Sequence, residues 1–404
     1  MPKKILIFSL AYYPKHIGGA EVAIKEITDR LDPARYEFHV LCNRYDAMLP
    51  SEEQVGNVFV HRIGITTNNP SMGDLRKWPL HLNKIIYQWQ AFREAKRLHS
   101  THHFDGVWAM MAHATGVPAG RFKRAFPEVR YLLTLQEGDP PAYIEKKMRV
   151  FGSWFRDAFT QADCIQVISN FLGLWAKGMG YGGEPLLVPN AVDTAHFTQT
   201  YSKEVLQAVR DEFKVAATDT LLVTTSRLVP KNAVDDVIEA LVHLPDSVKF
   251  IVFGTGPEEA RLRALVAARG LTDRVQLRGQ IGHAEMPKYL KACDIFIRPS
   301  RSEGMGNSFV EAMAAELPVI ATQEGGIADF LFDAKRNPTL SATGFAVDAN
   351  SPQQIATVVT HIMNSPVEVQ ATVARAKAMA IATYDWDLIA NQMDVKVFTP
   401  LFQS

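Results

Sequence analysis

The sequence has few cysteines, no excess of either charge and no long run of apolar residues. Its three cysteines, Cys42, Cys164 and Cys293, are far apart along the 404 residues and form neither a metal-ligand spacing nor a disulfide framework. Such sparse cysteine favours a reducing, cytoplasmic compartment. With 43 basic and 43 acidic residues the formal net charge is zero, which argues against a general nucleic-acid-binding protein. The apolar run after Lys4 is too short to span a membrane, and no small-residue cleavage site follows it, so we interpret it as the first strand.

The sequence does contain a repeated alternation of apolar strands and amphipathic helices. In the first half, strands are expected at residues 5–10, 36–42, 58–63, 105–110, 130–135 and 164–169, with helices at 20–31, 75–100 and 116–123. In the second half, strands are expected at 221–226, 249–254, 274–278, 294–298, 318–322 and 344–347. Such alternation predicts an α/β protein with parallel sheets and right-handed crossovers. We therefore expect two doubly wound, Rossmann-like domains, residues 1–195 and 196–384, joined by a polar connection at 194–214.

The most informative segment is the polar loop that joins the strand at 294–298 to a helix expected at 309–316. Ligands of open α/β sheets bind beyond the carboxyl ends of strands, and anions bind at helix N-termini. A local alternative concerns Ser308 and Glu311, whose spacing also fits a capping box at the start of the helix. That alternative requires neither Glu303 nor the glycines of the loop. The loop supplies these candidate residues: Glu303, Gly304, Met305, Gly306, Asn307, Ser308 and Glu311.

The spacing from Glu303 to Glu311, with Gly304 and Gly306 between them, resembles the E-x7-E signature of retaining GT-B glycosyltransferases (glycosyl transferases group 1, family 4 type). The resemblance implies two facing domains with an interdomain cleft, in which the first binds the acceptor and the second binds a nucleotide-sugar donor. It also implies that a C-terminal helix at 385–404 packs back on the first domain. By position, Glu303 would contact donor-sugar hydroxyls, Glu311 the ribose hydroxyls, and the N–H groups near Asn307 the diphosphate.

Three further segments of the second half follow strands. Arg227 and Lys231 suit a diphosphate, because a guanidinium binds phosphate bidentately and an ammonium acts as a point charge. A solvated basic loop is the alternative, and relatives commonly place the lysine where this chain has Asn232. The resemblance assigns Arg227 and Lys231 to catalysis, and it assigns donor binding to two glycine-containing turns, which contain Gly254 and Gly256, and Gly279 and Ile281.

The first half contributes candidates of two kinds. Gly18 and Gly19 lie at a strand-to-helix junction, where glycine lets a backbone approach phosphate, although a plain tight turn is the alternative. His113 follows a strand end and is either a site residue or a satisfied polar residue; the resemblance makes it a donor-sugar contact with a catalytic role. Near the next strand ends, Glu137 and Asp139 either recognise the acceptor or form the turn before two prolines, and Asn190 joins them in the acceptor assignment.

Two stretches combine basic and aromatic residues: the helix at 75–100 and the segment 146–156. A basic amphipathic helix can lie on an anionic membrane surface, whereas an ordinary domain helix with its apolar side inward is the alternative. Membrane attachment would place the enzyme peripherally on the inner face of the membrane.

The sequence as a whole predicts a retaining, hexosyltransferase-type glycosyltransferase that needs no cofactor and no obligatory metal, because the cationic pair and helix N-termini stabilise the leaving diphosphate. The resemblance implies that the acceptor attacks from the face that the leaving group departs. The expected partners are a UDP-sugar or GDP-sugar donor and a glycan or lipid-linked acceptor, with no nucleic acid. Alternatives are a nucleotide-sugar epimerase or a phosphorylase on the same scaffold, and a non-catalytic sugar-nucleotide-binding subunit.

Overall fold

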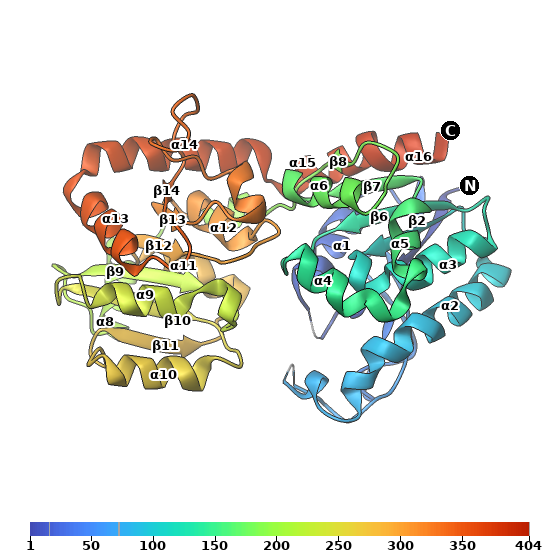
Figure 1. Cartoon of the computed structure of the whole chain (residues 1–404), viewed down its shortest axis with the longest axis horizontal. Coiled ribbons are helices and arrows are strands. Elements are labelled where there is room, and N and C mark those ends of the chain that lie inside the picture. The colour runs from blue at the N-terminus through green and yellow to red at the C-terminus, as the bar shows by residue number, and fades with distance from the viewer. Residues whose placement is uncertain (16, 72, 404) are drawn as a thin grey trace. The chain divides into compact units, whose positions relative to one another are not determined.

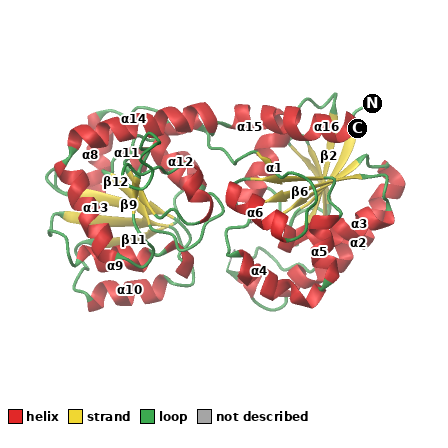
Figure 2. Ribbon diagram, turned by 45° about the horizontal axis from the view of Figure 1, so that its top comes forward, coloured by secondary structure: helices red, strands yellow, loops and turns green. Residues whose placement is uncertain are grey.

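The computed structural model describes residues 1–15, 17–71 and 73–403, and these residues form two compact units. Unit 1 comprises residues 1–190 together with 386–403, and unit 2 comprises Ala191–Asp385. Each unit is an α/β sandwich in which helices cover both faces of one sheet, as the red helices and yellow strands of Figure 2 show. The expectation of two doubly wound, parallel-sheet domains is therefore confirmed.

The sheet of unit 1 has eight strands in the order β3-β4-β2-β1-β5-β6-β7-β8. Figure 1 labels four of them, β2, β6, β7 and β8. All neighbouring pairs are parallel except β3 and β4, which are antiparallel. Without the edge strand β3, the order is that of a doubly wound Rossmann sheet. The order of the strands along the sheet, not their orientation, reverses between β1 and β5. The strands are β1 (Lys3–Phe8), β2 (Tyr36–Asn43), β3 (Glu52–Val55), β4 (Val58–Ile63), β5 (Gly106–Met110), β6 (Arg130–Leu135), β7 (Cys164–Val167) and β8 (Leu186–Leu187).

The inner strands of unit 1 are apolar runs because helices cover them on both faces. In β1, the side chains from Ile5 to Phe8 are at most 1% exposed, as a central parallel strand requires. The covering elements are α1 (Gly19–Arg30), α2 (Asn83–His102), the π-helical turn η3 (Ala112–Gly116), α3 (Val117–Ala125), α4 (Pro141–Met148), η4 (Arg149–Phe151), α5 (Ser153–Thr160) and α6 (Asn170–Gly178).

Unit 1 departs from the sequence expectation at two places. The helix expected from residue 75 begins only at Asn83, because Pro79 breaks the pattern and residues 74–82 form two short 3₁₀ turns, η1 (Asp74–Arg76) and η2 (Leu80–Leu82). The edge strand β3 is not among the expected strands. Its polar sequence, Glu-Glu-Gln-Val, is typical of an exposed edge rather than of a buried strand.

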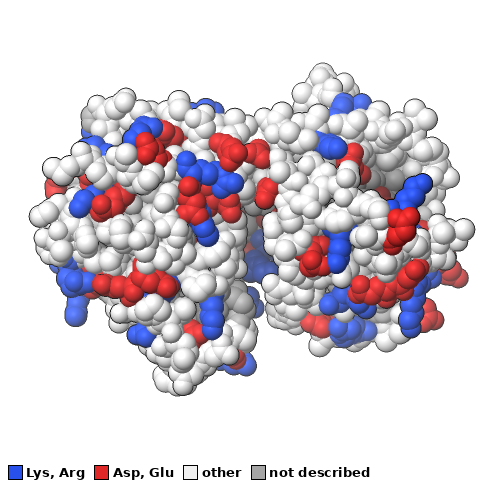
Figure 3. Space-filling view, turned by 180° about the vertical axis from the view of Figure 1, so that it is seen from behind, with Lys and Arg blue, Asp and Glu red and all other residues white. Residues whose placement is uncertain are grey.

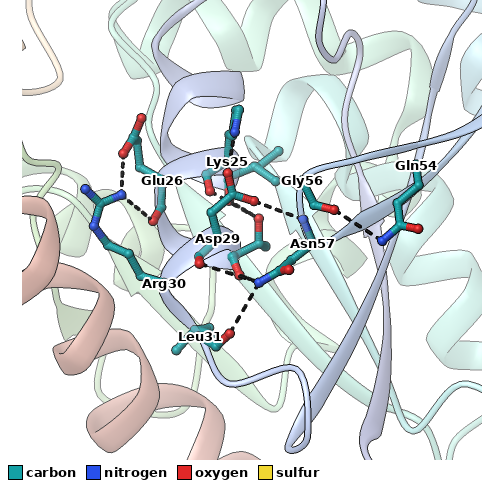
Figure 4. A network of polar contacts seen from close by, with 10 residues as sticks. Lys25, Glu26, Asp29, Arg30, Leu31, Gln54, Gly56 and Asn57 are labelled. Carbon is teal, nitrogen blue, oxygen red and sulfur yellow. Dashed lines mark hydrogen bonds and ion pairs between the residues drawn. The ribbon is translucent and has the colours of Figure 1, made fainter.

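A polar network fixes the β3–β4 turn against the end of α1 (Figure 4). The Asn57 side-chain amide donates to the carbonyl oxygens of Thr28 at 3.2 Å, and of Asp29 and Leu31 at 3.5 Å. Its backbone N–H donates to the Asp29 carboxylate at 3.0 Å. The last carbonyls of a helix have no partner inside the helix, so an asparagine from a neighbouring turn supplies the missing donors.

The C-terminal segment of the chain packs on unit 1. It comprises α15 (Trp386–Gln392), the π-helical turn η8 (Met393–Phe398) and α16 (Thr399–Gln403). Arg30 of α1 forms an ion pair with Asp387 at 2.6 Å, and Arg35 forms one with Asp394. The Phe398 ring packs on Trp108 of β5 at a centroid distance of 5.3 Å. Contacts of both kinds therefore hold the end of the chain to the first half of the sequence.

Unit 2 contains a six-stranded parallel sheet in the order β11-β10-β9-β12-β13-β14, which is again the Rossmann order. Its strands are β9 (Thr220–Thr225), β10 (Val248–Phe253), β11 (Val275–Gly279), β12 (Ile295–Arg298), β13 (Val319–Ala321) and β14 (Phe345–Ala346). Its helices are α7 (Thr194–Phe197), α8 (Lys203–Glu212), α9 (Val234–Leu241), α10 (Glu259–Ala268), α11 (Met286–Lys291), α12 (Asn307–Ala314), α13 (Pro352–Asn364) and α14 (Pro366–Thr383), with 3₁₀ turns η5 (Pro230–Asn232), η6 (His283–Glu285) and η7 (Gly325–Asp329).

The core of unit 2 lies between its sheet and the helices that cover it. Buried side chains of β9, β10 and β12, including Leu222, Phe250 and Ile297, meet Val237 of α9 and Val359 of α13 in one cluster. The segment 194–214, expected to be a plain connection, forms α7 and α8. Both helices begin with a side-chain cap, and in α8 the Ser202 hydroxyl accepts from the N–H of Val205.

Charged side chains of both signs lie beside one another over much of the face in Figure 3, consistent with the balanced composition. Several form ion pairs within one helix, such as Arg263 with Glu259 at 2.8 Å. Cys42, Cys164 and Cys293 are buried and form no disulfide with one another. A reducing compartment stays an expectation.

Candidate functional site

The candidate residues of unit 2 gather at the carboxyl ends of β9 and β12. These strands are neighbours, and the strand order reverses between them, which is where ligands of doubly wound sheets bind. The loop after β9 contains Arg227 and Lys231, and the loop after β12 contains Glu303. The fold therefore brings together segments about 70 residues apart in sequence, as right-handed crossovers require.

Arg298, the last residue of β12, lies at the centre of this group. It is 5% exposed, and its guanidinium donates to Ser308 Oγ at 2.7 Å, Glu303 Oε2 at 3.1 Å and the carbonyl of Thr225 at 3.3 Å. It also lies 4.1 Å from the centroid of the Phe309 ring. Burial lowers the pKa of Arg298, the carboxylates of Glu303 and Glu311 oppose that shift, and the charge of Arg227 adds to it. Sequence analysis missed this residue as part of the site; its one signal was a charge in a strand that is otherwise apolar.

The loop after β12 is held so that the Glu303 carboxylate points at Arg298. Its backbone is fixed from η7, because the N–H of Gly326 donates to the carbonyl of Glu303 at 3.0 Å. The other carboxylate oxygen of Glu303 accepts from the N–H of Gly304 at 3.2 Å. The ion pair with the buried Arg298 guanidinium and the hydrogen bond from Gly304 fix the Glu303 carboxylate in position.

The capping box considered for Ser308 and Glu311 is not formed. The helix α12 begins at Asn307 with Gly306 as its N-cap, so Ser308 lies inside the first turn and its hydroxyl accepts from Arg298. Gly306 has φ of +87°, and a Cβ there would lie 2.6 Å from the Phe309 ring and 2.7 Å from the Arg298 guanidinium. Glycine is therefore required for both conformation and space.

Glu311 has no capping role and lies largely shielded from solvent near Arg298. Its side chain is 17% exposed, and His283 Nε2 lies 3.9 Å from its carboxylate. Burial raises the pKa of Glu311 to about 7, against the opposing effect of Arg298. A buried carboxylate with a shifted pKa in a ligand-binding position is a recurring mark of functional sites. It can accept hydrogen bonds from two vicinal hydroxyls.

Arg227 and Lys231 lie on the loop after β9, and this loop is tied to the loop after β12. Arg227 is exposed and Lys231 is half-buried. The N–H of Arg301 donates to the carbonyl of Lys231 at 2.7 Å. At the position where relatives commonly have lysine, Asn232 is 5% exposed and donates to the carbonyl of Arg227 at 2.7 Å. Asn232 therefore shapes the loop, while the cationic groups come from Arg227 and Lys231.

The glycines after β10 permit close approach of backbones rather than forming an open turn. A Cβ on Gly254 would lie 1.8 Å from the carbonyl oxygen of Ser226, and one on Gly256 would lie 2.3 Å from that of Leu228. The N–H of Gly254 donates to the carbonyl of Gly279 at 2.7 Å. These contacts place the loops after β9, β10 and β11 side by side.

The remaining donor candidates of unit 2 differ in exposure. Ile281 is half-buried, whereas Gly304 is buried and the Met305 side chain is 2% exposed. Met305 therefore has only its backbone to offer a ligand. The Asn307 side chain donates to the carbonyl of Ala191 at 3.3 Å, and the N–H groups at the start of α12 are of the kind that lack partners inside a helix.

In unit 1, His113 and Glu137 form a pair. His113 lies in the π-helical turn η3, after β5, and Glu137 follows β6. The Glu137 carboxylate, which is fully buried, lies 3.3 Å from His113 Nδ1 and accepts from the N–H of Gln136 at 3.0 Å. A carboxylate on Nδ1 favours the tautomer with a free Nε2, an arrangement that orients a histidine toward a ligand. Glu137 therefore orients His113 in addition to lying in the segment before the prolines.

The other acceptor candidates lie near this pair in sequence. Asn190 is 6% exposed and donates through its side chain to Gln136 Oε1 at 3.2 Å. Gln136, which was not expected to take part, thus links Asn190 to the segment that carries Glu137. Asp139 is exposed, before the prolines that open α4.

Gly18 and Gly19 lie at the expected strand-to-helix junction, with Gly19 as the first residue of α1. Gly18 is the N-cap of α1, and its N–H donates to the carboxylate of Glu21 at 2.7 Å. Glu21 is 7% exposed, and burial raises its pKa. Around Gly19 a Cβ would meet nothing within 4 Å, so this position leaves open space at the helix N-terminus. Glu21 is a further residue that sequence analysis did not single out.

The sequence contains one pair of carboxylates at Asp-x-Asp spacing, Asp385 and Asp387, a spacing that can hold a divalent cation. The two carboxylates have different partners: Asp385 accepts from the Thr194 hydroxyl at 2.5 Å, and Asp387 pairs with Arg30 at 2.6 Å. They belong to different units. This pair is therefore accounted for by ordinary structural contacts.

Comparison with known proteins gives the family. The profile described as "Glycosyl transferases group 1" matches residues 207–379, and that described as "Glycosyltransferase Family 4" matches residues 17–196. The chain belongs to the group 1 glycosyltransferases. This glycosyltransferase has the two-domain GT-B fold: it superposes on sucrose-phosphate synthase from Thermosynechococcus elongatus with a TM-score of 0.81 and 19% identity, over 99% of each chain.

Curated relatives of this glycosyltransferase include enzymes named for glycolipid acceptors. It is 23% identical to an alpha-monoglucosyldiacylglycerol synthase of Acholeplasma laidlawii, over 97% of this chain and 96% of the relative. It is 26% identical to a GDP-mannose-dependent monoacylated alpha-(1-6)-phosphatidylinositol monomannoside mannosyltransferase of Corynebacterium glutamicum, over 58% of this chain and 61% of that relative. Among the described residues, no helix has the length and apolarity needed to cross a membrane.

Proposed function

We propose that this glycosyltransferase moves a hexosyl group from a nucleotide diphosphate sugar to a glycan or glycolipid acceptor with retention of configuration at the anomeric carbon. The observation that carries the proposal is the charged group at the ends of β9 and β12. Arg298 there fixes the Glu303 carboxylate at 3.1 Å, and its pKa responds to both Glu311 and Arg227. Family membership supports a transferase over the epimerase, phosphorylase and binding-subunit alternatives.

Each of the charged candidate residues Arg227, Lys231, Glu303 and Glu311 has a role in this proposal. Arg227, Lys231 and the N-terminus of α12 stabilise the charge that develops on the leaving diphosphate as the bond from its oxygen to the anomeric carbon breaks. Loss of one such donor typically costs about 10²–10³ in rate. Glu303 orients the donor sugar and stabilises positive charge on it. Glu311 accepts hydrogen bonds from the ribose hydroxyls.

The acceptor oxygen attacks the anomeric carbon from the face that the diphosphate leaves, and its proton passes to a leaving phosphate oxygen. Attack from this face retains the anomeric configuration without an enzyme nucleophile. The cationic groups of unit 2 stabilise the leaving diphosphate, as a metal ion would. In unit 1, His113 held by Glu137 contacts a sugar hydroxyl through Nε2. Glu137, Asp139 and Asn190 belong to the acceptor side of the reaction.

The test is a transfer assay with UDP-hexoses and GDP-hexoses, a diacylglycerol glycolipid as acceptor, and EDTA present or absent. We expect one donor class to give product with the anomeric configuration of the donor, indifferent to EDTA. Arg227→Ala and Glu303→Gln should lower the rate at least about 100-fold, while Arg263→Ala, another exposed arginine of unit 2, should not change it. Product from donor alone or with inorganic phosphate would instead identify an epimerase or a phosphorylase, and wild-type rates in Arg227→Ala and Glu303→Gln would refute the site.

We also infer that unit 1 docks on anionic membranes. The Trp89 ring of α2 lies 5.6 Å from that of Phe151 in η4, so the two basic and aromatic stretches are adjacent. Apolar side chains near them are exposed, Trp78 by 77% and Val150 by 83%. Exposed aromatic residues beside lysines are typical of membrane-surface segments. The alternative of an ordinary domain helix accounts for the buried side of α2, which includes Tyr87.

Flotation with anionic phosphatidylglycerol vesicles tests this inference. The wild-type protein should float with anionic vesicles and not with neutral phosphatidylcholine vesicles. Val150→Ser should weaken flotation, while Leu174→Ser, which changes another exposed apolar residue of unit 1, should not. Equal flotation of the two variants would contradict a docking surface at these stretches.

A further inference from the structure

Three histidines of unit 1 form a compact cluster that the proposed transfer reaction does not use. His39 lies on β2, His61 on β4, and His102 is the last residue of α2. Each histidine has one ring nitrogen that lies within 4.8 Å of a ring nitrogen of each of the other two histidines. The His39 and His61 rings are almost parallel, at a centroid distance of 5.3 Å, and the His102 ring is 4.5 Å from that of His39.

The contacts of His39 and His61 form a chain that lacks one proton. His39 Nε2 lies 3.0 Å from a Glu37 carboxylate oxygen, and His61 Nδ1 lies 3.3 Å from a Glu52 carboxylate oxygen. Between the rings, His39 Nδ1 and His61 Nε2 are 3.0 Å apart. Three such contacts need three protons, but two neutral imidazoles carry only two. Because carboxylates only accept, both protons go to the outer contacts, and two lone pairs then face each other.

The surroundings disfavour the other ways of supplying that proton. His39 is 2% exposed and His61 is 8% exposed, and the rings of Phe59 and Phe104 each lie 5.1 Å from that of His39. A charged imidazolium is costly in such an apolar setting. Each carboxylate also has a cationic side chain beside it, because Lys4 lies 3.5 Å from Glu37 and Arg97 lies 3.8 Å from Glu52. A cation between the two nitrogens resolves the conflict.

We propose that His39, His61 and His102 bind a divalent transition-metal ion, with Zn²⁺ as the ion that best suits three imidazoles and a fourth position. Two nitrogens about 2.0–2.1 Å from a tetrahedral zinc ion lie roughly 3.3 Å apart, close to the 3.0 Å between His39 Nδ1 and His61 Nε2. Glu37 and Glu52 then act as the carboxylates that orient zinc-bound histidines.

The metal site is structural and separate from the transfer chemistry. In a parallel sheet with crossover helices, the C-terminus of α2 lies toward the amino ends of the strands, whereas His113 and Glu137 follow the carboxyl ends of β5 and β6. The ion would join the last turn of α2 to two neighbouring strands near the edge of the sheet. It therefore holds a crossover helix in place and takes no part in the reaction.

The test uses the full-length protein stripped of metal with EDTA and then titrated with Zn²⁺ in competition with a chromogenic chelator. We expect one tightly bound ion per chain and a higher melting temperature than in EDTA. Addition of Co²⁺ in place of Zn²⁺ should give the visible absorption bands of a tetrahedral nitrogen site. Absence of both tight Zn²⁺ binding and those bands would overturn the proposal.

Two adjacent histidines provide a matched pair of variants. His102 is half-buried in the cluster, and His103 is exposed with a φ of +55°, which asparagine tolerates. His102→Asn should weaken Zn²⁺ binding at least about 100-fold, whereas His103→Asn should change it less than about twofold. Glu37→Gln should weaken it about 10–100-fold, as expected for the partner of a metal-bound histidine. Equal Zn²⁺ affinity in His102→Asn and His103→Asn, with both variants folded in EDTA, would refute the assignment.

Discussion

Glu311 should make unit 2 less stable as the pH rises through neutrality. Burial raises the pKa of Glu311 from 4.5 to about 7 in the folded protein. Between those values the folded state binds more protons than the unfolded state, so the free energy of unfolding falls as pH increases. The difference of about 2.5 pKa units corresponds to about 3 kcal/mol, which is lost mostly between pH 5 and pH 8. Below pH 4.5 the carboxyl group is protonated in both states and the effect vanishes.

Replacement of Glu311 by glutamine removes that ionisation while keeping the size of the side chain. We expect Glu311→Gln to be about 3 kcal/mol more stable relative to wild type at pH 8.5 than it is at pH 4.5. For a unit of this size, that difference raises the melting temperature by about 6–12 °C at pH 8.5. The variant should also bind nucleotide more weakly, because a neutral amide is a weaker acceptor for hydroxyls than a carboxylate.

The assay is differential scanning calorimetry across pH, read beside tryptophan fluorescence. All six tryptophans lie outside residues 191–385, so a heat-absorbing transition without a fluorescence change belongs to unit 2. Glu285→Gln provides the control, because Glu285 is 57% exposed and paired with Lys288; it should show no such pH dependence. A gap between Glu311→Gln and wild type that is the same at pH 4.5 and pH 8.5 would refute the reasoning.

Three other changes test the packing around the site and the end of the chain. Arg298→Met should lower the free energy of unfolding by about 3–5 kcal/mol, since it leaves the Glu303 carboxylate, which is only 14% exposed, without its partner. A loss below about 1 kcal/mol in urea unfolding would contradict the ion pair. Gly306→Ala should cost at least about 1–2 kcal/mol because of its φ of +87°, and an unchanged melting temperature would show that the loop has another conformation. Asp394→Ala removes the acceptor of Arg35 and Tyr36 and should make the C-terminal helices more susceptible to trypsin. Asp387→Ala, which breaks an exposed ion pair, should increase trypsin cleavage less. Faster cleavage of Asp387→Ala than of Asp394→Ala would contradict the described packing.

The sheets could be predicted from the sequence because parallel strands buried on both faces are short apolar runs. The expected strands at 58–63 and 130–135 coincide with β4 and β6. Helix boundaries were less predictable where local signals compete. Aromatic residues continue the apolar pattern of α2 backwards past Pro79, but the proline ends the helix there. The helix α8 was not predicted because residues 194–214 are mostly polar and few side chains of this helix are buried.

Much of the candidate site could be predicted only as positions along the chain. The resemblance placed Arg227, Glu303 and His113 after strands, where the structure has them. It could not show that Arg298 is buried and binds Glu303, because that depends on how tightly the loop after β12 folds back. Nor could it show that Glu137 orients His113, since the two residues meet through the pairing of β5 with β6.

The histidine cluster could not be predicted at all. His39, His61 and His102 match no metal-binding spacing in the sequence, and each alone is an ordinary residue of a strand or a helix. They meet because β4 pairs with β2 and the crossover helix α2 ends over that pair. The sheet order, rather than any local motif, creates this group.

We propose that the loops after β9 and β12 hold the diphosphate of a nucleotide sugar. Isothermal titration of the purified protein with UDP and with GDP, in the presence of EDTA, tests it most directly when Arg227→Ala is measured beside Arg263→Ala. We expect one nucleotide to bind to the wild type and to Arg263→Ala with equal affinity. Arg227→Ala should weaken this binding at least about tenfold, the effect of losing one charged hydrogen bond. Binding that is unchanged in Arg227→Ala, or no binding of either nucleotide to the wild type, would contradict it.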